Sequence, residues 1–331
     1  LLKIYVTQEH VKINRKTILT ARDFVLSGVK LMPKVNIGVA LGEGGARGLA
    51  HIGVLQVLQE AGFEIDILAG TSIGALIGAM YSESLDPEKI QRRFEDFIQG
   101  DMYQKSGFPY ISKPTEREPN FWDQITERVR ETIALNLAQS KIGLLSQEKL
   151  EKGIQMLLKA KTFEECKIPL ITVATDLESG HEIPFGNGDL FKAVLASAAI
   201  PGFFPPIHHR GFVLSDGAIC CPIPTKYAVC DRDTLVVGVG VLPNLENPKQ
   251  IENALDVMIR AENINMYHLS RNLMRFADVQ IYPQTGNVAW NEFHRLQELI
   301  QSGRKAAETA LPELEHKIKR KASWWQNIFS S

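Results

Sequence analysis

The fold is decided by residues 65–82, which read IDILAGTSIGALIGAMYS. Residues 65–69 are a short apolar run that predicts a buried strand, and residues 73–82 are small and apolar in a pattern that suits a buried helix. The apolar stretch 65–81 has 17 residues, which is short of the roughly 20 that a bilayer requires. We therefore interpret it as strand, tight turn and helix rather than as a membrane span.

Ser72, within that turn, is a candidate nucleophile. It stands between Gly70 and Gly74, and glycines at these positions remove the side chains that would collide in a sharp strand-to-helix turn. Such a turn presents the hydroxyl at the carboxyl end of the sheet, where the N-terminus of the next helix favours developing negative charge. The placement between a buried strand and a small-residue helix strengthens an otherwise moderate Gly-x-Ser-x-Gly signal.

The same pattern occurs once more upstream. Residues 35–41 form a short apolar run that ends in glycines, and residues 46–61 repeat apolar side chains at helical period. Two strands, each followed by a helix, indicate a parallel sheet with helices on both faces. Further helices are predicted at 87–98, 123–138, 146–159, 190–198, 251–276 and 292–319, and further strands at 169–175, 211–214, 234–241 and 279–282.

The composition excludes two classes of protein. Of the 331 residues, 44% are hydrophobic and 23% charged, which excludes disorder as the main state. Lys and Arg number 37 against 38 Asp and Glu, so the excess positive charge that nucleic-acid binding requires is missing. The four cysteines lack zinc-site spacing, which predicts reduced thiols in a cytoplasmic protein.

A glycine-rich loop at 42–48, GEGGARG, joins the first predicted strand to its helix. Successive glycine N–H groups at a helix start form a cradle for a phosphate or an oxyanion. A dinucleotide site is the rival interpretation, but the GxGxxG spacing is absent and the second strand ends at Gly70 without a ribose-binding carboxylate. The loop therefore favours acyl transfer, with the N–H groups of Gly44 and Gly45 facing a tetrahedral oxyanion.

Two kinds of residue are candidates for the base that activates the serine. A triad in the order serine, acid, histidine is satisfied by His268 and His294, both within long charged predicted helices. The competitor is Asp216, in the stretch LSDGA at 214–218, directly after a short predicted strand. An aspartate beside glycine is also a common turn former. These residues alone leave both alternatives open.

Four linked motifs resemble those of the patatin-like phospholipases. They are GGARGLAHIGVL at 44–55, GTSIG at 70–74, ASAAIPGFFPP at 196–206 and DGA at 216–218. Their order and spacing match the family over about residues 35–230, with bacterial proteins similar to the neuropathy target esterase catalytic domain as the most similar subgroup. The resemblance implies a three-layer α/β/α fold with a mainly parallel central sheet and a helical insertion.

The resemblance also implies a Ser-Asp dyad without histidine. Ser72 would attack the ester carbonyl, Asp216 would accept its proton, and water would hydrolyse the acyl-serine intermediate. The dyad requires no cofactor and no metal. We therefore expect a serine acyl hydrolase of lipid esters, a lysophospholipase or phospholipase. An acyltransferase using the same intermediate and a catalytically silent lipid-binding module are the alternatives.

The remaining site residues follow from the same resemblance. The N–H groups of Gly44 and Gly45, with that of Ala46 or Ile73, would hold the oxyanion. Arg47 has two possible roles, as a support of the oxyanion loop through nearby carbonyl groups or as a ligand of a substrate phosphate. The two roles are weighed evenly.

Two departures from the family pattern stand out. Glu43 replaces the first of three glycines, and we expect its carboxylate to point away from the oxyanion site. Cys221-Pro222 replaces asparagines that commonly follow the DGA motif, which leaves the support of the Asp216 loop undefined. We expect His51 to be a packed helix residue and not a base.

We predict a helical N-terminal extension at 1–34, a catalytic core at 35–230, and strands and helices at 231–331 that complete the same domain. The chain begins at Leu1, which suggests a trimmed chain. Residues 103–122 are rich in glycine, proline and aromatic residues, which is typical both of a flap over a site and of an ordinary surface loop with anchoring rings. The basic and aromatic tail at 317–329 predicts transient contact of a cytoplasmic protein with a membrane surface.

Overall fold

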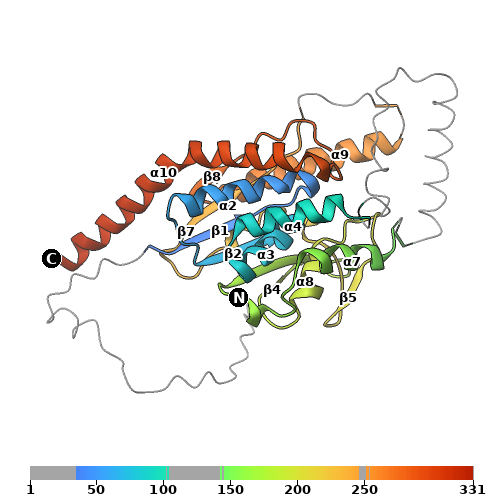
Figure 1. Cartoon of the computed structure of the whole chain (residues 1–331), viewed down its shortest axis with the longest axis horizontal. Coiled ribbons are helices and arrows are strands. Elements are labelled where there is room, and N and C mark those ends of the chain that lie inside the picture. Colours follow the sequence, from blue (N-terminus) through green and yellow to red (C-terminus); the bar gives the residue numbers. More distant parts are fainter. Residues whose placement is uncertain are drawn as a thin grey trace. The chain divides into compact units, whose positions relative to one another are not determined.

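The computed structural model describes residues 35–101, 103, 142, 143, 145–245, 251, 252 and 254–330, with side chains at all of these except 255 and 324–330 (Figure 1). The predicted helical extension at 1–34 and the predicted helix at 123–138 lie outside the described residues, as does all of the segment 103–122 except Tyr103. Residues 35–321 form one compact unit. The predicted boundaries at residues 34 and 230 stay predictions.

A mostly parallel sheet is the centre of this unit. In it, β1 (Ile37–Leu41) pairs in parallel with β2 (Ile67–Thr71) on one side and with β7 (Leu235–Val239) on the other. The sheet continues in parallel from β2 to β3 (Leu170–Asp176) and from β7 to β8 (Val279–Ile281). This confirms the parallel arrangement that the strand-helix alternation predicts.

The sheet ends in antiparallel strands that the sequence pattern did not predict in full. The strands β4 (Glu182–Phe185) and β5 (Ile207–His209) were missed, and β6 (Phe212–Asp216) runs two residues beyond its predicted end. β3 pairs antiparallel with β4 and β6, and β6 with β5. The short connections from β3 to β4 and from β5 to β6 contain no crossover helix and therefore require antiparallel neighbours. The extension of β6 places Asp216 at the end of a strand.

Alternating side chains of the strands face two separate cores. Val39 and Leu41 of β1 point into a large core, and Ala40 between them points into a smaller one on the opposite face. The large core contains side chains of α2 (Ala50–Glu60), α3 (Ile73–Ser84), α4 (Pro87–Gln99), α7 (Gln147–Leu157), α8 (Leu190–Ser197) and α10 (Leu296–Ser330). The smaller core contains Met274 of α9 (Ala254–Met274). Helices therefore cover both faces, as predicted.

The helix that follows the glycine-rich loop is shorter than its predicted range of 46–61. Residues 45–49 form a tight 3₁₀ helix, and α2 begins only at Ala50. α10 lies along α2 (Figure 1), so closely that a Cβ atom at Gly53 would collide with the carbonyl oxygen of Ile300. This close packing fixes the position of the loop that precedes α2.

None of the helices among the described residues is both long enough and apolar enough to cross a bilayer. The apolar stretch 65–81 is divided between β2 and α3, as the sequence predicts.

Candidate active site

Ser72 occupies a strained turn between β2 and α3. Its backbone angles are φ 56° and ψ −123°, a conformation that costs a non-glycine residue about 1–3 kcal/mol. The turn lies against the end of β1, where a Cβ atom at Gly74 would collide with the carbonyl oxygen of Leu41. On the other side of the serine, Gly70 lies in the fully buried strand β2, and a Cβ atom there would collide with the carbonyl oxygen of Gly74. The local structure is thus a nucleophile elbow with a buried serine at its apex.

The Ser72 hydroxyl donates a hydrogen bond of 2.6 Å to Oδ2 of Asp216. Both side chains are buried, with 6% of Ser72 and 3% of Asp216 exposed. The other carboxyl oxygen, Oδ1, accepts a hydrogen bond of 2.9 Å from the N–H of Ala218. The carboxyl group is therefore held at both oxygens, with one of them facing the hydroxyl.

The protonation of Asp216 is set mainly by its burial. Burial raises the pKa of this carboxyl group to about 7. The hydrogen bonds from Ser72 and Ala218 act in the opposite direction, and the nearby Glu43 carboxylate raises the pKa further. A carboxylate with a pKa near neutrality is well matched to accept a proton at physiological pH.

Ser197, in the ASAAIPGFFPP motif, holds the elbow in place. Its hydroxyl accepts a 2.9 Å hydrogen bond from the N–H of Ser72 and donates one of 2.6 Å to the carbonyl oxygen of Val173. The sequence pattern indicated no role for this serine. The small residues around it indicated only close packing, and the fold brings it beside Ser72, which is 125 positions away in the chain.

The glycine-rich loop leaves two backbone donors beside the serine. Within the described part of the chain, the N–H groups of Gly44 and Gly45 donate to no other protein group. Gly45 has a positive φ of 54° and lines the same pocket as Ser72. A Cβ atom there would collide with the backbone of Trp290, so the loop requires glycine at this position.

Ala46 does not contribute to this pair of donors. Its N–H donates a 2.6 Å hydrogen bond to the carbonyl oxygen of Trp290, so the expectation that Ala46 is an oxyanion donor is wrong for this arrangement. The N–H group of Ala46 instead joins the glycine-rich loop to the segment between β8 and α10. Sequence pattern could not identify this bond because Trp290 is distant in the chain and carries no motif.

Arg47 and His51 both bind carbonyl groups of the loop. Arg47 Nε donates to the carbonyl oxygen of Gly44 at 3.3 Å. Of the two roles considered for Arg47, this contact corresponds to support of the oxyanion loop. His51 is fully buried, and this burial lowers its pKa to about 4. The ring is therefore neutral at physiological pH, and its Nε2 lies 2.8 Å from the carbonyl oxygen of Gly42. His51 is a packed helix residue, as expected.

Glu43 differs from our expectation of an outward-pointing carboxylate. The residue is half-buried, and burial raises its pKa, with the Arg47 charge lowering it and the Glu262 charge raising it. Its own charge also acts on Asp216. The physical reason is the backbone of Glu43, whose N–H is held at 2.9 Å by the carbonyl oxygen of Pro222, close to the Asp216 loop.

The Cys221-Pro222 pair supports the Asp216 loop through its backbone. The N–H of Cys221 donates to the carbonyl oxygen of Gly217 at 2.8 Å, and the Cys221 carbonyl oxygen accepts from the hydroxyl of Thr71 at 2.8 Å. Thr71 directly precedes the nucleophile. These bonds join the two loops without the amide side chains that the family commonly has there.

Neither candidate histidine contacts the serine. His268 and His294 are both exposed, and the hydroxyl of Ser72 donates to Asp216. Within the described ranges, no three His, Cys, Asp or Glu side chains are grouped to hold a metal ion.

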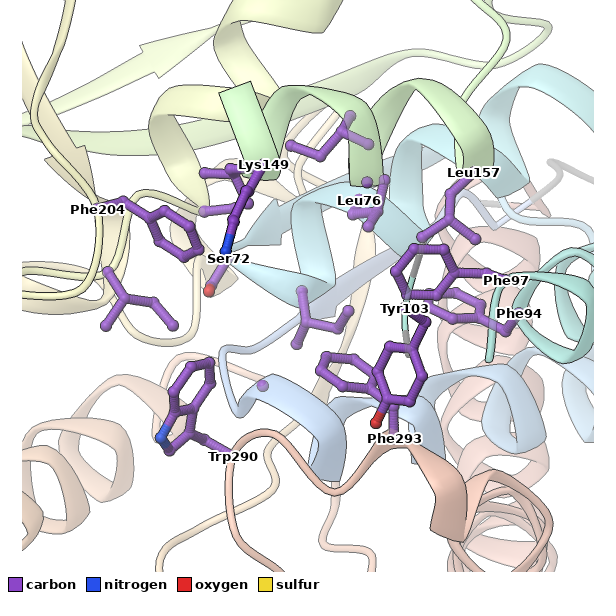
Figure 2. Close-up of a pocket in the computed structure, with 17 residues that line it drawn as sticks. Ser72, Leu76, Phe94, Phe97, Tyr103, Lys149, Leu157, Phe204, Trp290 and Phe293 are labelled. Carbon is purple, nitrogen blue, oxygen red and sulfur yellow. The ribbon is translucent and has the colours of Figure 1, made fainter. Parts of the chain in front are cut away.

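An apolar pocket opens beside Ser72 and encloses about 700 Å³, counted with the space at its open mouth. Figure 2 shows Ser72, Phe204 and Trp290 at one end and a cluster of aromatic rings at the other. The rings of that cluster are Phe94, Phe97, Tyr103 and Phe293. The almost entirely apolar lining suits a hydrocarbon chain that begins at the serine.

A family model described as patatin-like phospholipase matches residues 39–229, which is more than half of the chain. The chain belongs to the patatin-like phospholipase family. An uncharacterised NTE family protein of Mycobacterium tuberculosis is 34% identical over 205 residues, covering 62% of this chain and 49% of that protein. A second uncharacterised NTE family protein of Mycobacterium tuberculosis is 28% identical over 301 residues, covering 83% of this chain and 46% of that protein. The chain thus spans about half the length of these bacterial relatives.

Similar proteins are also found in mouse and in Legionella pneumophila. Mouse patatin-like phospholipase domain-containing protein 6 is 28% identical over 207 residues, which is 62% of this chain and 13% of the mouse protein. VipD of Legionella pneumophila has a crystal structure with a TM-score of 0.45 and 15% identity, covering 84% of this chain and 67% of VipD.

Proposed function

We propose that the protein is a serine acyl hydrolase of lipid esters, with lysophospholipids or phospholipids as substrates. The observation that carries the proposal is the 2.6 Å hydrogen bond from the Ser72 hydroxyl to Asp216 at the mouth of an apolar pocket. Membership of the patatin-like phospholipase family supports the same class of substrate. Lipid substrates imply transient contact of the protein with a membrane surface.

The proposed reaction has two steps. In the first, Ser72 Oγ attacks the ester carbonyl carbon while its proton passes to Asp216, and the alcohol leaves with that proton. In the second, water attacks the acyl-serine, Asp216 accepts the water proton, and the proton returns to Ser72 Oγ as the carboxylic acid is released. The N–H groups of Gly44 and Gly45, with that of Ile73 at the start of α3, would bind the oxyanion in both steps.

Trapping of the acyl-enzyme tests this proposal directly. A fluorophosphonate ester resembles the tetrahedral intermediate and binds covalently to an activated serine. We expect complete labelling of the wild-type protein and, after proteolysis and mass spectrometry, a phosphonate adduct on the peptide that contains Ser72. Absence of an adduct, or an adduct on another serine, would contradict the proposal. A rapid acid quench during turnover of a lysophospholipid should show an acyl group on the same peptide.

The replacement Glu43→Gln is expected to move the acid limb of kcat/KM to lower pH. Asp216 must be ionised to accept the serine proton, and burial followed by the Glu43 charge raises the pKa of Asp216. When the Glu43 charge is removed, burial alone still raises the pKa of Asp216, and this pKa becomes lower than in the wild-type protein. The ionised form of Asp216, which is the active one, therefore persists at lower pH. The pH profile of kcat/KM on a neutral soluble ester measures the shift.

Glu262→Gln is the matched control for this experiment. Glu262 acts on Glu43 but is absent from the groups that shift Asp216, so its replacement should leave the acid limb in place. Equal shifts in the two variants would indicate a general effect of net charge. No shift in Glu43→Gln would show that Glu43 is already protonated over the range in which the enzyme works.

A further inference from the structure

The described lining of the pocket includes a single charged residue, Lys149, in the first turn of α7. Apart from Ser72, the remaining lining residues are glycines, aliphatic residues and aromatic residues. Lys149 lines the pocket and is nevertheless exposed as a residue. This combination places Lys149 at the mouth of the pocket and not in its interior.

Lys149 lies at the Ser72 end of the pocket. Figure 2 shows its side chain extending from α7 with the nitrogen directed toward Ser72, away from the ring cluster. An independent contact supports this placement, because the N–H of Leu145, just before α7, donates a 2.7 Å hydrogen bond to the carbonyl oxygen of Phe203. Phe204, the next residue, lines the pocket at the same end.

Arg47, the cation of the glycine-rich loop, is not among the described residues that line the pocket. Its Nε donates to the carbonyl oxygen of Gly44. A substrate with its acyl chain in the pocket and its ester carbonyl at Ser72 has its alcohol part at the mouth. The cation that meets this alcohol part is Lys149.

We propose that Lys149 binds an anionic group on the alcohol part of the substrate, which makes a lysophospholipid phosphate a preferred head group over a neutral glycerol. The inference rests on the proposed acyl hydrolase function and adds a specificity-determining residue to it. An ammonium-phosphate pair at a pocket mouth is a charge-assisted hydrogen bond partly screened by water. We expect it to contribute about tenfold to the discrimination between charged and neutral substrates.

The test compares two glycerol esters, one with an anionic phosphate in its head group and one without. Lysophosphatidylglycerol and monoacylglycerol with the same short acyl chain are used below their aggregation thresholds, so that adsorption to an interface does not contribute. The quantity measured is the ratio of their kcat/KM values. Lys149→Ala should lower this ratio about tenfold, mainly through the KM of the charged ester, and Lys149→Arg should restore most of it.

Lys152→Ala is the matched control. Lys152 lies in the same helix and is paired with Glu148 at 2.6 Å, and it does not line the pocket. The Lys152→Ala variant should leave the ratio of the two kcat/KM values unchanged. An unchanged ratio in Lys149→Ala, or an equal fall in Lys152→Ala, would overturn the inference. Failure of the proposed function looks different, because the wild-type protein would then cleave neither ester and form no acyl-serine.

Discussion

Replacement of Ser72 by alanine is expected to reduce ester hydrolysis by about 10⁴-fold or more, since the covalent route is lost with the hydroxyl. Alanine fits the elbow no worse than serine, because both have a Cβ atom and meet the same positive φ of 56°. The protein should therefore remain folded. Turnover of a lysophospholipid and of a soluble ester measures the loss, and circular dichroism with thermal unfolding checks the fold.

Ser82→Ala is a suitable control for this experiment. Ser82 is a fully buried serine in α3, the helix that follows Ser72, and its hydroxyl has no hydrogen-bond partner among the described residues. Removing an unpaired buried hydroxyl costs little or stabilises the protein, so activity should be retained. Substantial hydrolysis by Ser72→Ala would show that another group performs the reaction.

The second large effect is expected for Asp216→Asn, with a fall in kcat of about 10²–10⁴-fold. Asparagine keeps the shape of the side chain, and its oxygen can still accept the hydrogen bond from the N–H of Ala218. It cannot accept the serine proton. The wild-type profile of kcat/KM should rise with pH to a plateau with a midpoint near the pKa of Asp216, which is about 7. This limb should be missing from whatever activity the variant retains.

The same substitution should raise stability at neutral and alkaline pH. Because burial raises the pKa of Asp216 from 3.8 to about 7, the folded protein holds a proton that the unfolded chain releases between these values. Stability from this group is full below pH 3.8, falls as the pH rises toward 7, and is constant at higher pH. Asp216→Asn removes that decrease, which is on the order of 4 kcal/mol at pH 8.

Thermal unfolding at pH 5 and pH 8 measures this difference. Asp189→Asn is the control, because Asp189 caps α8 through the N–H of Lys192 and asparagine caps equally well. Near-normal turnover in Asp216→Asn would return His268 and His294 to consideration, although both are exposed. Lower stability of the variant at pH 8 would show that the carboxylate is stabilised in a way that its burial does not indicate.

The central strands and helices could be predicted because their signals are local. The buried strand and small-residue helix around Ser72 form β2 and α3 almost at their predicted bounds. The strands β4 and β5 were missed because they are short and half-exposed, so neither shows clear alternation. Their pairing is specified by β3 and β6, which a pattern confined to one segment does not reveal.

For the candidate site, motifs predicted which residues meet, and only the fold showed how they are held. The approach of Ser72 to Asp216 was expected from the resemblance. The bond from Ala46 to Trp290 and the inward position of Glu43 were not, since both depend on contacts between distant loops. Lys149 carries no motif, and its place at the pocket mouth follows from the packing of α7.

Trp290 and Phe293 lie well beyond residue 229, where the family match ends, yet they form one wall of the pocket, and Trp290 anchors the glycine-rich loop. The shape of the pocket therefore depends on residues on both sides of that boundary. Under the proposed function, a change at Phe293 should alter which acyl chain fits, whereas a change at Trp290 should also displace the glycine-rich loop. A chimera that contains only the matched stretch would include the serine but lack Trp290 and Phe293, and with them one wall of the pocket. Grafts between relatives therefore need to include residues up to the start of α10.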